Sequence, residues 1–80
     1  MYKVKLSDRA KKSLKSMDES LRIRVFDMIV SLGEKPRPAG YELIEDEDLG
    51  SLYRIREDDF RIIYQLKNKT IRVVAITTGY

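Results

Sequence analysis

Residues 53–66, with the sequence YRIREDDFRIIYQL, carry the clearest structural signal in the chain. Successive side chains of a β-strand point to opposite faces, so Arg54 and Arg56 lie on one face and Tyr53 and Ile55 on the other. After the acidic turn at 57–59, apolar residues recur at every second position, namely Phe60, Ile62, Tyr64 and Leu66. The stretch predicts a β-hairpin whose apolar face, aromatic rings included, packs in the core rather than stacking on nucleic-acid bases.

The other face of this hairpin gathers Arg54, Arg56 and Arg61 if the apolar face packs against helices. A guanidinium group carries a fixed charge and forked N–H donors that match phosphate oxygens, so this cluster suits a phosphate backbone. Arginine is also a good solvated residue on a half-buried strand. The pattern alone leaves the binding and the structural interpretations open.

The composition excludes several kinds of chemistry. The 80-residue chain is 42% hydrophobic, enough for one modest core, and we expect a single domain over residues 1–80. It contains no cysteine and no histidine, which excludes disulfides, thiolate zinc sites and Ser-His-Asp triads. We expect no metal and no organic cofactor. No apolar run approaches the ~18 residues of a membrane span, so we expect a cytoplasmic protein without a membrane partner.

The charge is unevenly distributed along the chain. The formal net charge is +3, and residues 1–15 hold six basic residues against Asp8 alone. Residues 42–48 contain five acidic residues and no basic residue. They are Glu42 and the consecutive residues Glu45, Asp46, Glu47 and Asp48. A basic protein with such a patchy surface suits nucleic acid or an acidic protein partner.

The first half of the chain reads as a strand followed by two helices. Residues 2–6 alternate apolar and basic residues, as a strand does, and Ser7 is a good N-cap for a helix after it. Asp18 is the expected N-cap of a second helix, which we expect to end at Gly33. The second helix has one apolar stripe over residues 21–32. A further stripe at Ile23, Phe26 and Val30 predicts burial over a wide arc.

The second half reads as strands. Residues 41–44 form a short strand candidate, residues 51–57 and 59–67 form the hairpin, and residues 71–77 form a final strand rich in β-branched residues. Asn68 suits the turn before the last strand because it tolerates positive φ. The order is β-α-α-β-β-β with an antiparallel meander at the end. This predicts an α+β fold, a helical hairpin packed on one face of a mostly antiparallel twisted sheet.

The chain resembles the RelE/ParE superfamily of toxins from type II toxin–antitoxin pairs. The resemblance covers nearly the whole chain and is carried by the order of elements, the basic first helix and the segment Tyr53–Tyr64. The family pattern there is Tyr, basic, aliphatic, basic, a short turn, aromatic, Arg, two aliphatics and Tyr. The segment 76–79, Ile-Thr-Thr-Gly, is similar to the family's last strand.

The resemblance implies a function and a set of site residues. RelE-type members cleave mRNA in the ribosomal A site, and we expect this activity for the chain. ParE-type members inhibit DNA gyrase, and this activity is the alternative. A third possibility is a truncated or degenerate toxin that only binds its antitoxin. Arg54 and Arg56 match the paired basic positions, and Arg61 matches the arginine thought to stabilise the scissile phosphate. Expected partners are a small antitoxin with an acidic amphipathic tail, the ribosome and mRNA.

The general base of such a reaction is left open by the sequence. A guanidinium stays protonated in proteins, so an arginine serves poorly as a base. Glu42 is a candidate base, with an exposed strand residue as the simpler interpretation. Tyr80 is the remaining candidate, either stacking on a base or aiding proton transfer. The chain ends at Tyr80 where relatives continue with a His-Arg or similar pair, so loss of a final segment is the other interpretation.

Overall fold

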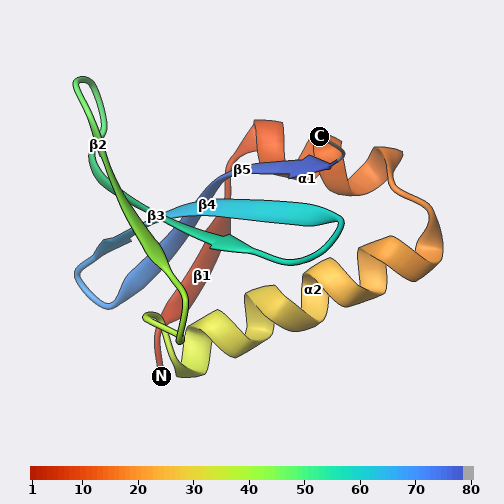
Figure 1. Ribbon diagram of the computed structural model, residues 1–80, viewed down its shortest axis with the longest axis horizontal. Helices are drawn as coiled ribbons and strands as arrows, with labels where there is room; N and C mark the ends of the chain where they lie inside the picture. The colour runs from red at the N-terminus through yellow and green to blue at the C-terminus, as the bar shows by residue number, and fades with distance from the viewer. Residues whose placement is uncertain (79–80) are drawn as a thin grey trace.

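The computed structural model describes residues 1–78, which form two helices and five strands (Figure 1). In chain order the elements are β1 (Lys3–Leu6), α1 (Asp8–Ser16), α2 (Glu19–Glu34), β2 (Glu42–Asp46), β3 (Gly50–Arg56), β4 (Phe60–Lys67) and β5 (Thr70–Thr78). The strands form one sheet in the order β1-β5-β4-β3-β2. None of the helices within these residues is long and apolar enough to cross a membrane.

The sheet is mixed but mostly antiparallel. β1 pairs with β5 in parallel, whereas β2, β3, β4 and β5 pair antiparallel in succession. The short strand candidate near residue 42 is therefore a full member of the sheet, and the meander has four strands where the sequence predicted three. Asn68 adopts a φ of 51° in the turn between β4 and β5, as its tolerance of positive φ predicted. The α+β fold predicted from the sequence is confirmed.

Both helix N-termini are capped as predicted. The side chain of Ser7 accepts a hydrogen bond from the backbone N–H of Ala10, and that of Asp18 accepts one from Leu21. Each bond satisfies a donor that the first turn of a helix leaves without a partner. Arg22 donates from Nε to the carbonyl of Leu14 and from Nη2 to that of Met17, which ties α2 to the end of α1.

The predicted end of α2 at Gly33 is wrong. The helix continues to Glu34, and Gly33 is a buried residue inside it, where β1 passes close to the helix. The backbone N–H of Tyr2 donates to the carbonyl of Gly33 at 2.9 Å, and a Cβ at this position would lie 3.5 Å from Val4 Cγ2. The glycine therefore sits at a helix–strand crossing rather than at a helix terminus.

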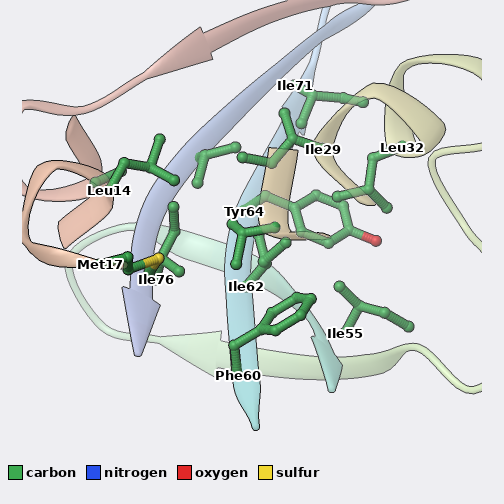
Figure 2. Packing of buried hydrophobic residues seen from close by; sticks show 13 residues of the cluster. Leu14, Met17, Ile29, Leu32, Ile55, Phe60, Ile62, Tyr64, Ile71 and Ile76 are labelled. Atoms are coloured by element: carbon green, nitrogen blue, oxygen red, sulfur yellow. The ribbon is translucent and has the colours of Figure 1, made fainter. Parts of the chain in front are cut away.

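The core lies between the two helices and one face of the sheet. Figure 2 shows Tyr64 among side chains from both layers, with Ile29 and Leu32 of α2 beside it and Phe60 and Ile62 of its own strand nearby. Tyr64 and Ile62 are fully buried. The aromatic residues of the hairpin face this core, as the alternation predicted. Arg54, Arg56 and Arg61 lie on the opposite face of the sheet, which the helices leave uncovered and which we call the open face.

The prediction that α2 is buried over a wide arc is wrong. Ile23, Phe26 and Val30 are each about half exposed, at 54%, 51% and 57%. Only the stripe that contains Val25 and Ile29 faces the sheet. A helix in a two-layer domain has one neighbour layer, so a second stripe on its side has nothing in the described chain to pack against.

A β-bulge in β5 changes which side chains reach the open face. The pairing with β4 passes from Ile63 and Ala75 directly to Tyr64 and Val73, so Val74 is an extra residue on β5. The hydroxyl of Ser7 donates to the carbonyl of Val74 at 2.7 Å. An extra residue reverses the alternation of side chains beyond it. Without the bulge the strand could not place both Thr77 and Arg72 on the open face.

Candidate functional site

The predicted arginine cluster lies on the open face, across β3 and β4. Arg56 is directly opposite Arg61 in the antiparallel register, and Arg54 is two residues further along β3 on the same face. Side chains directly opposite in such a pair have Cβ atoms ~5 Å apart, so the side chains of Arg56 and Arg61 leave the sheet next to each other. Arg56 is exposed, whereas Arg54 and Arg61 are half-buried.

Glu42 joins the cluster from the neighbouring strand. Glu42 is the cross-strand partner of Arg54 in the pairing of β2 with β3. The carboxylate of Glu42 accepts hydrogen bonds from Arg54 Nη2 at 2.8 Å and from Arg54 Nε at 3.3 Å. Glu42 is an exposed strand residue, which agrees with the simpler interpretation, but its carboxylate is hydrogen-bonded to Arg54.

The arginines set the ionisation state of Glu42. The hydrogen bond from Arg54 lowers the pKa of Glu42, and the charges of Arg54, Arg56 and Arg61 lower it further. In return, the hydrogen bond from Arg54 to Glu42 raises the pKa of Arg54. At neutral pH the site therefore holds one carboxylate among three guanidinium groups, with a net positive charge.

This arrangement can bind a phosphodiester and stabilise added negative charge on it. The backbone ladder fixes where the three side chains leave the sheet, and guanidinium donors directed at a phosphate stabilise charge that develops in a transition state. The ionised Glu42 is in the protonation state that a general base requires. Because its pKa is lowered, Glu42 is a weaker base than a group whose pKa lies near the working pH.

An aromatic column behind the sheet fixes the loop that leads into β2. Tyr64 donates its hydroxyl proton to the carbonyl of Pro36 at 2.7 Å, and its ring lies 5.7 Å from that of Tyr53. Tyr41 lies 5.6 Å from Tyr53, and the guanidinium of Arg37 lies over Tyr53 at 5.5 Å. Burial raises the pKa of Tyr64 to about 12. These contacts hold residues 36–41 and so place the start of β2, where Glu42 lies.

The remaining site predictions have different outcomes. Tyr80 lies outside the described residues, so its role stays a prediction. Among residues 1–78, no group of three or more acidic side chains is placed to hold a metal ion. Arg24 pairs with Asp59, which ties α2 to the turn between β3 and β4. The acidic turn thus has a structural partner on α2.

Sequence reasoning missed a second basic group at the other end of the open face. A cavity of about 690 Å³ is lined there by Lys5 of β1, Lys67 of β4 and Arg72 of β5. Lys5 was visible as a polar residue of the alternating first strand. The position of Arg72 was not, because it depends on the bulge at Val74, which has no sequence signal that we recognise.

The sequence matches one protein-family model over almost its full length. Residues 4–79 match the model for the ParE toxin of the parDE type II toxin–antitoxin system. No protein with curated function matches the sequence significantly.

Solved structures of toxins share the fold. The isolated RelE toxin of E. coli has a TM-score of 0.82 at 20% identity, with all of this chain and 86% of that chain covered. The RelE–RelB complex of Pyrococcus horikoshii gives 0.81 at 26% identity, with coverages of 96% and 93%. The toxin–antitoxin complex RelBE2 of Mycobacterium tuberculosis gives 0.84 at 16% identity, with 98% of each chain covered.

Proposed function

The chain belongs to the RelE/ParE superfamily of type II toxins, and from this premise we propose that it is a ribosome-dependent endoribonuclease that cuts mRNA in the A site. The observation that supports this most is the cluster of Arg54, Arg56 and Arg61 around the ionised Glu42. Such a cluster suits a phosphodiester, because it supplies three cations to bind the phosphate and one carboxylate to accept a proton. We expect the reaction to need no metal and to take place in the cytoplasm.

The proposed reaction is attack of the 2′-oxygen of RNA on the adjacent phosphorus. The 2′-hydroxyl proton passes to Glu42 as the bond between the 2′-oxygen and phosphorus forms. The bond between phosphorus and the 5′-oxygen breaks, which leaves a 2′,3′-cyclic phosphate, and the 5′-oxygen takes its proton from water. Arg61 stabilises the extra charge on the phosphorane, while Arg54 and Arg56 neutralise the backbone. We expect Tyr80, which lies outside the described residues, to aid the proton transfer to the leaving oxygen.

Binding of RNA must compete with the ion pair in the site. Glu42 occupies two of the five N–H donors of Arg54, so a phosphate that takes these same donors displaces the carboxylate. A carboxylate that loses this partner regains basicity, because the hydrogen bond is the largest cause of its lowered pKa. The exchange would make Glu42 a better base in the complex than in the free protein.

The first test is the effect of production in bacterial cells. The wild-type protein should stop growth and leave new mRNA 5′ ends within coding regions, and Arg61→Ala should do neither. Arg24→Ala is the matched control, because it removes an exposed arginine whose partner Asp59 lies on the turn beyond the site. Growth arrest with intact mRNA would contradict the proposal, as would a folded Arg61→Ala protein that still cuts mRNA.

Inhibition of DNA gyrase is the second candidate function. Two observations favour it: the matching family model is that of the ParE toxin, and Glu42 neutralises one of the three clustered arginines by its ion pair with Arg54. This function predicts accumulation of covalent gyrase–DNA complexes in cells that make the protein, with intact mRNA. The same cultures can be assayed for both products, so one experiment separates the two candidates.

A cognate antitoxin is the partner that the family implies. Solved relatives include toxin–antitoxin complexes, and we expect an antitoxin with an acidic amphipathic tail. The half-exposed side chains of Ile23, Phe26 and Val30 on α2 offer apolar contacts for such a tail. Phe26→Ser should weaken the complex about ten-fold in titration calorimetry. An unchanged affinity would remove α2 from the interface.

A further inference from the structure

The cavity at the far end of the open face is built from three adjacent strands. Its charged lining consists of Lys5, Lys67, Arg72 and Asp8, and the rest is mainly polar, with Ser7, Gln65, Asn68 and Thr70 beside Leu6. Lys5 pairs with Arg72 across β1 and β5, and Arg72 pairs with Gln65 across β5 and β4. The position of these lining residues is therefore set by the pairing of three strands and not by the conformation of a single loop.

The cations of this cavity are available for a ligand. Lys5, Lys67 and Arg72 are all exposed, and none of the three forms an ion pair with another residue in the described part of the chain. Asp8 is the single carboxylate in the lining, so the net charge of the lining is positive. Three like charges around one cavity, with a single carboxylate among them, repel one another, and an anion between them relieves that repulsion.

The cavity lies on the same face as the arginine cluster. Arg61 and Gln65 are four residues apart on β4 and point to the same side, so they are separated by ~13 Å at ~3.3 Å per residue. The residue between them on that face is the uncharged Ile63, which is half-buried. Two basic sites with an uncharged interval match a chain that carries separated negative charges.

We propose that this cavity is a second phosphate-binding site, which holds the backbone of single-stranded RNA away from the arginine cluster. The proposal rests on the proposed function, since it extends the path of the same RNA strand. Lys5 and Lys67 act as point charges on the phosphate, and Arg72 adds forked donors. Gln65, Asn68 and Thr70 supply neutral partners for phosphate or ribose oxygens.

The lining favours RNA over an acidic protein segment. An amphipathic tail needs an apolar groove for its anchoring side chains, with charge only at the rim. In this cavity Leu6 is the one apolar side chain among the lining residues described, and the others are polar or charged. The half-exposed apolar stripe of α2 offers that second kind of surface elsewhere on the molecule.

Binding of an uncleavable strand tests the proposal without relying on catalysis. The probe is a fluorescein-labelled 12-nucleotide RNA with 2′-O-methyl groups, titrated at several salt concentrations against wild type, Lys5→Gln, Lys67→Gln and Arg72→Gln. Each lost phosphate contact should reduce the slope of log K against log salt by about 0.7. The same contact is worth about four-fold in affinity at 0.15 M salt, and the triple variant should lose roughly 50-fold.

Two control variants make the result specific. Lys12→Gln removes the same charge from the exposed side of α1 and should leave the slope unchanged. Arg72→Lys keeps the charge and should keep most of the salt slope. All of these residues are exposed, and equal urea midpoints would show that the variants remain folded.

The outcomes separate this proposal from the proposed function. Slopes that do not change in the three variants, or that change equally in Lys12→Gln, would overturn the second site. A loss of affinity for an acidic peptide, with RNA binding unaffected, would assign the cavity to a protein partner and overturn it as well. Growth arrest with intact mRNA in the cell experiment would contradict the nuclease alone, because the RNA probe used here cannot be cleaved.

Discussion

Ser7 should contribute more to stability than a single helix cap does. Its hydroxyl oxygen accepts a hydrogen bond from the N–H of Ala10 at 3.0 Å and donates its proton to the carbonyl of Val74 at 2.7 Å. One side chain thus caps α1 and satisfies a carbonyl at the bulge of β5. The substitution Ser7→Ala removes both bonds without adding bulk.

The size of the effect follows from the two bonds. Loss of an N-cap costs ~1 kcal/mol, and a part-buried carbonyl left without its donor costs ~1 kcal/mol more. The free energy of unfolding should therefore fall by ~2 kcal/mol. For a domain of this size, 1 kcal/mol changes Tm by ~4–8 °C, so the variant should melt roughly 10 °C lower.

Asp18→Ala is the matched control for this prediction. Asp18 caps α2 through one exposed hydrogen bond to Leu21 at 2.8 Å, so its loss should cost only ~1 kcal/mol. Urea and thermal unfolding of both variants give the comparison. A cost for Ser7→Ala no greater than that for Asp18→Ala would refute the claim that the serine stabilises the bulge.

Three further predictions concern ionisation and backbone. Hydrogen bonds from arginines lower the pKa values of Glu42 and Asp59. The stability that these two ion pairs provide is therefore present above pH ~4 and is lost as the pH falls further. Asp59→Asn should flatten the pH dependence of the urea midpoint below pH ~4. Burial raises the pKa of Tyr64 to about 12, so the contribution of this tyrosine to stability is present below pH ~10 and is lost as the pH rises toward 12. Tyr64→Phe should not lose stability in this alkaline range, and it should be ~1 kcal/mol less stable at neutral pH because the hydrogen bond to Pro36 is lost. Gly33→Ala should raise the free energy of unfolding by ~0.5–1 kcal/mol, because alanine favours the helix and no atom outside the helix lies closer than 3.5 Å to the added Cβ. Gly50→Ala should lower the free energy of unfolding by ~1 kcal/mol, because φ at this position is +79°. The urea midpoints of the two glycine variants test these predictions. A Gly33→Ala protein less stable than wild type would show that β1 cannot move away to make room for the added Cβ.

The hairpin and the helix starts could be predicted because their causes are local. Alternation with a period of two, together with burial of the apolar side of both strands, places Arg54 and Arg61 on one face, as the register bears out. A serine or aspartate before a helical pattern caps it through its own backbone neighbours, as Ser7 and Asp18 do. These features needed no knowledge of distant contacts.

The errors and omissions arise where distant parts of the chain meet. The stripe at Ile23, Phe26 and Val30 is apolar enough for burial, but whether a second layer covers it is not written in the helix. The sequence pattern predicts a helix end at Gly33, because the role of this glycine as a crossing point depends on β1. The placement of Arg72 depends on a bulge that a serine from another element supports.

The electrostatic pairing in the site is also a product of register. Glu42 meets Arg54 because β2 pairs with β3 through the short turn that ends at Gly50. A shift of one residue would turn Glu42 to the helix side of the sheet and leave the arginines without a carboxylate. The sequence suggested both residues but not their contact.

The most direct test of the nuclease is a single-turnover reaction on bacterial ribosomes programmed with a defined mRNA. The protein should cut within the A-site codon, Arg61→Ala should lose at least about 100-fold in rate as an enzyme does when one charge-stabilising donor is removed, and Arg24→Ala should match wild type. Equal rates for Arg61→Ala and wild type, or no cleavage by the wild-type protein, would contradict the account.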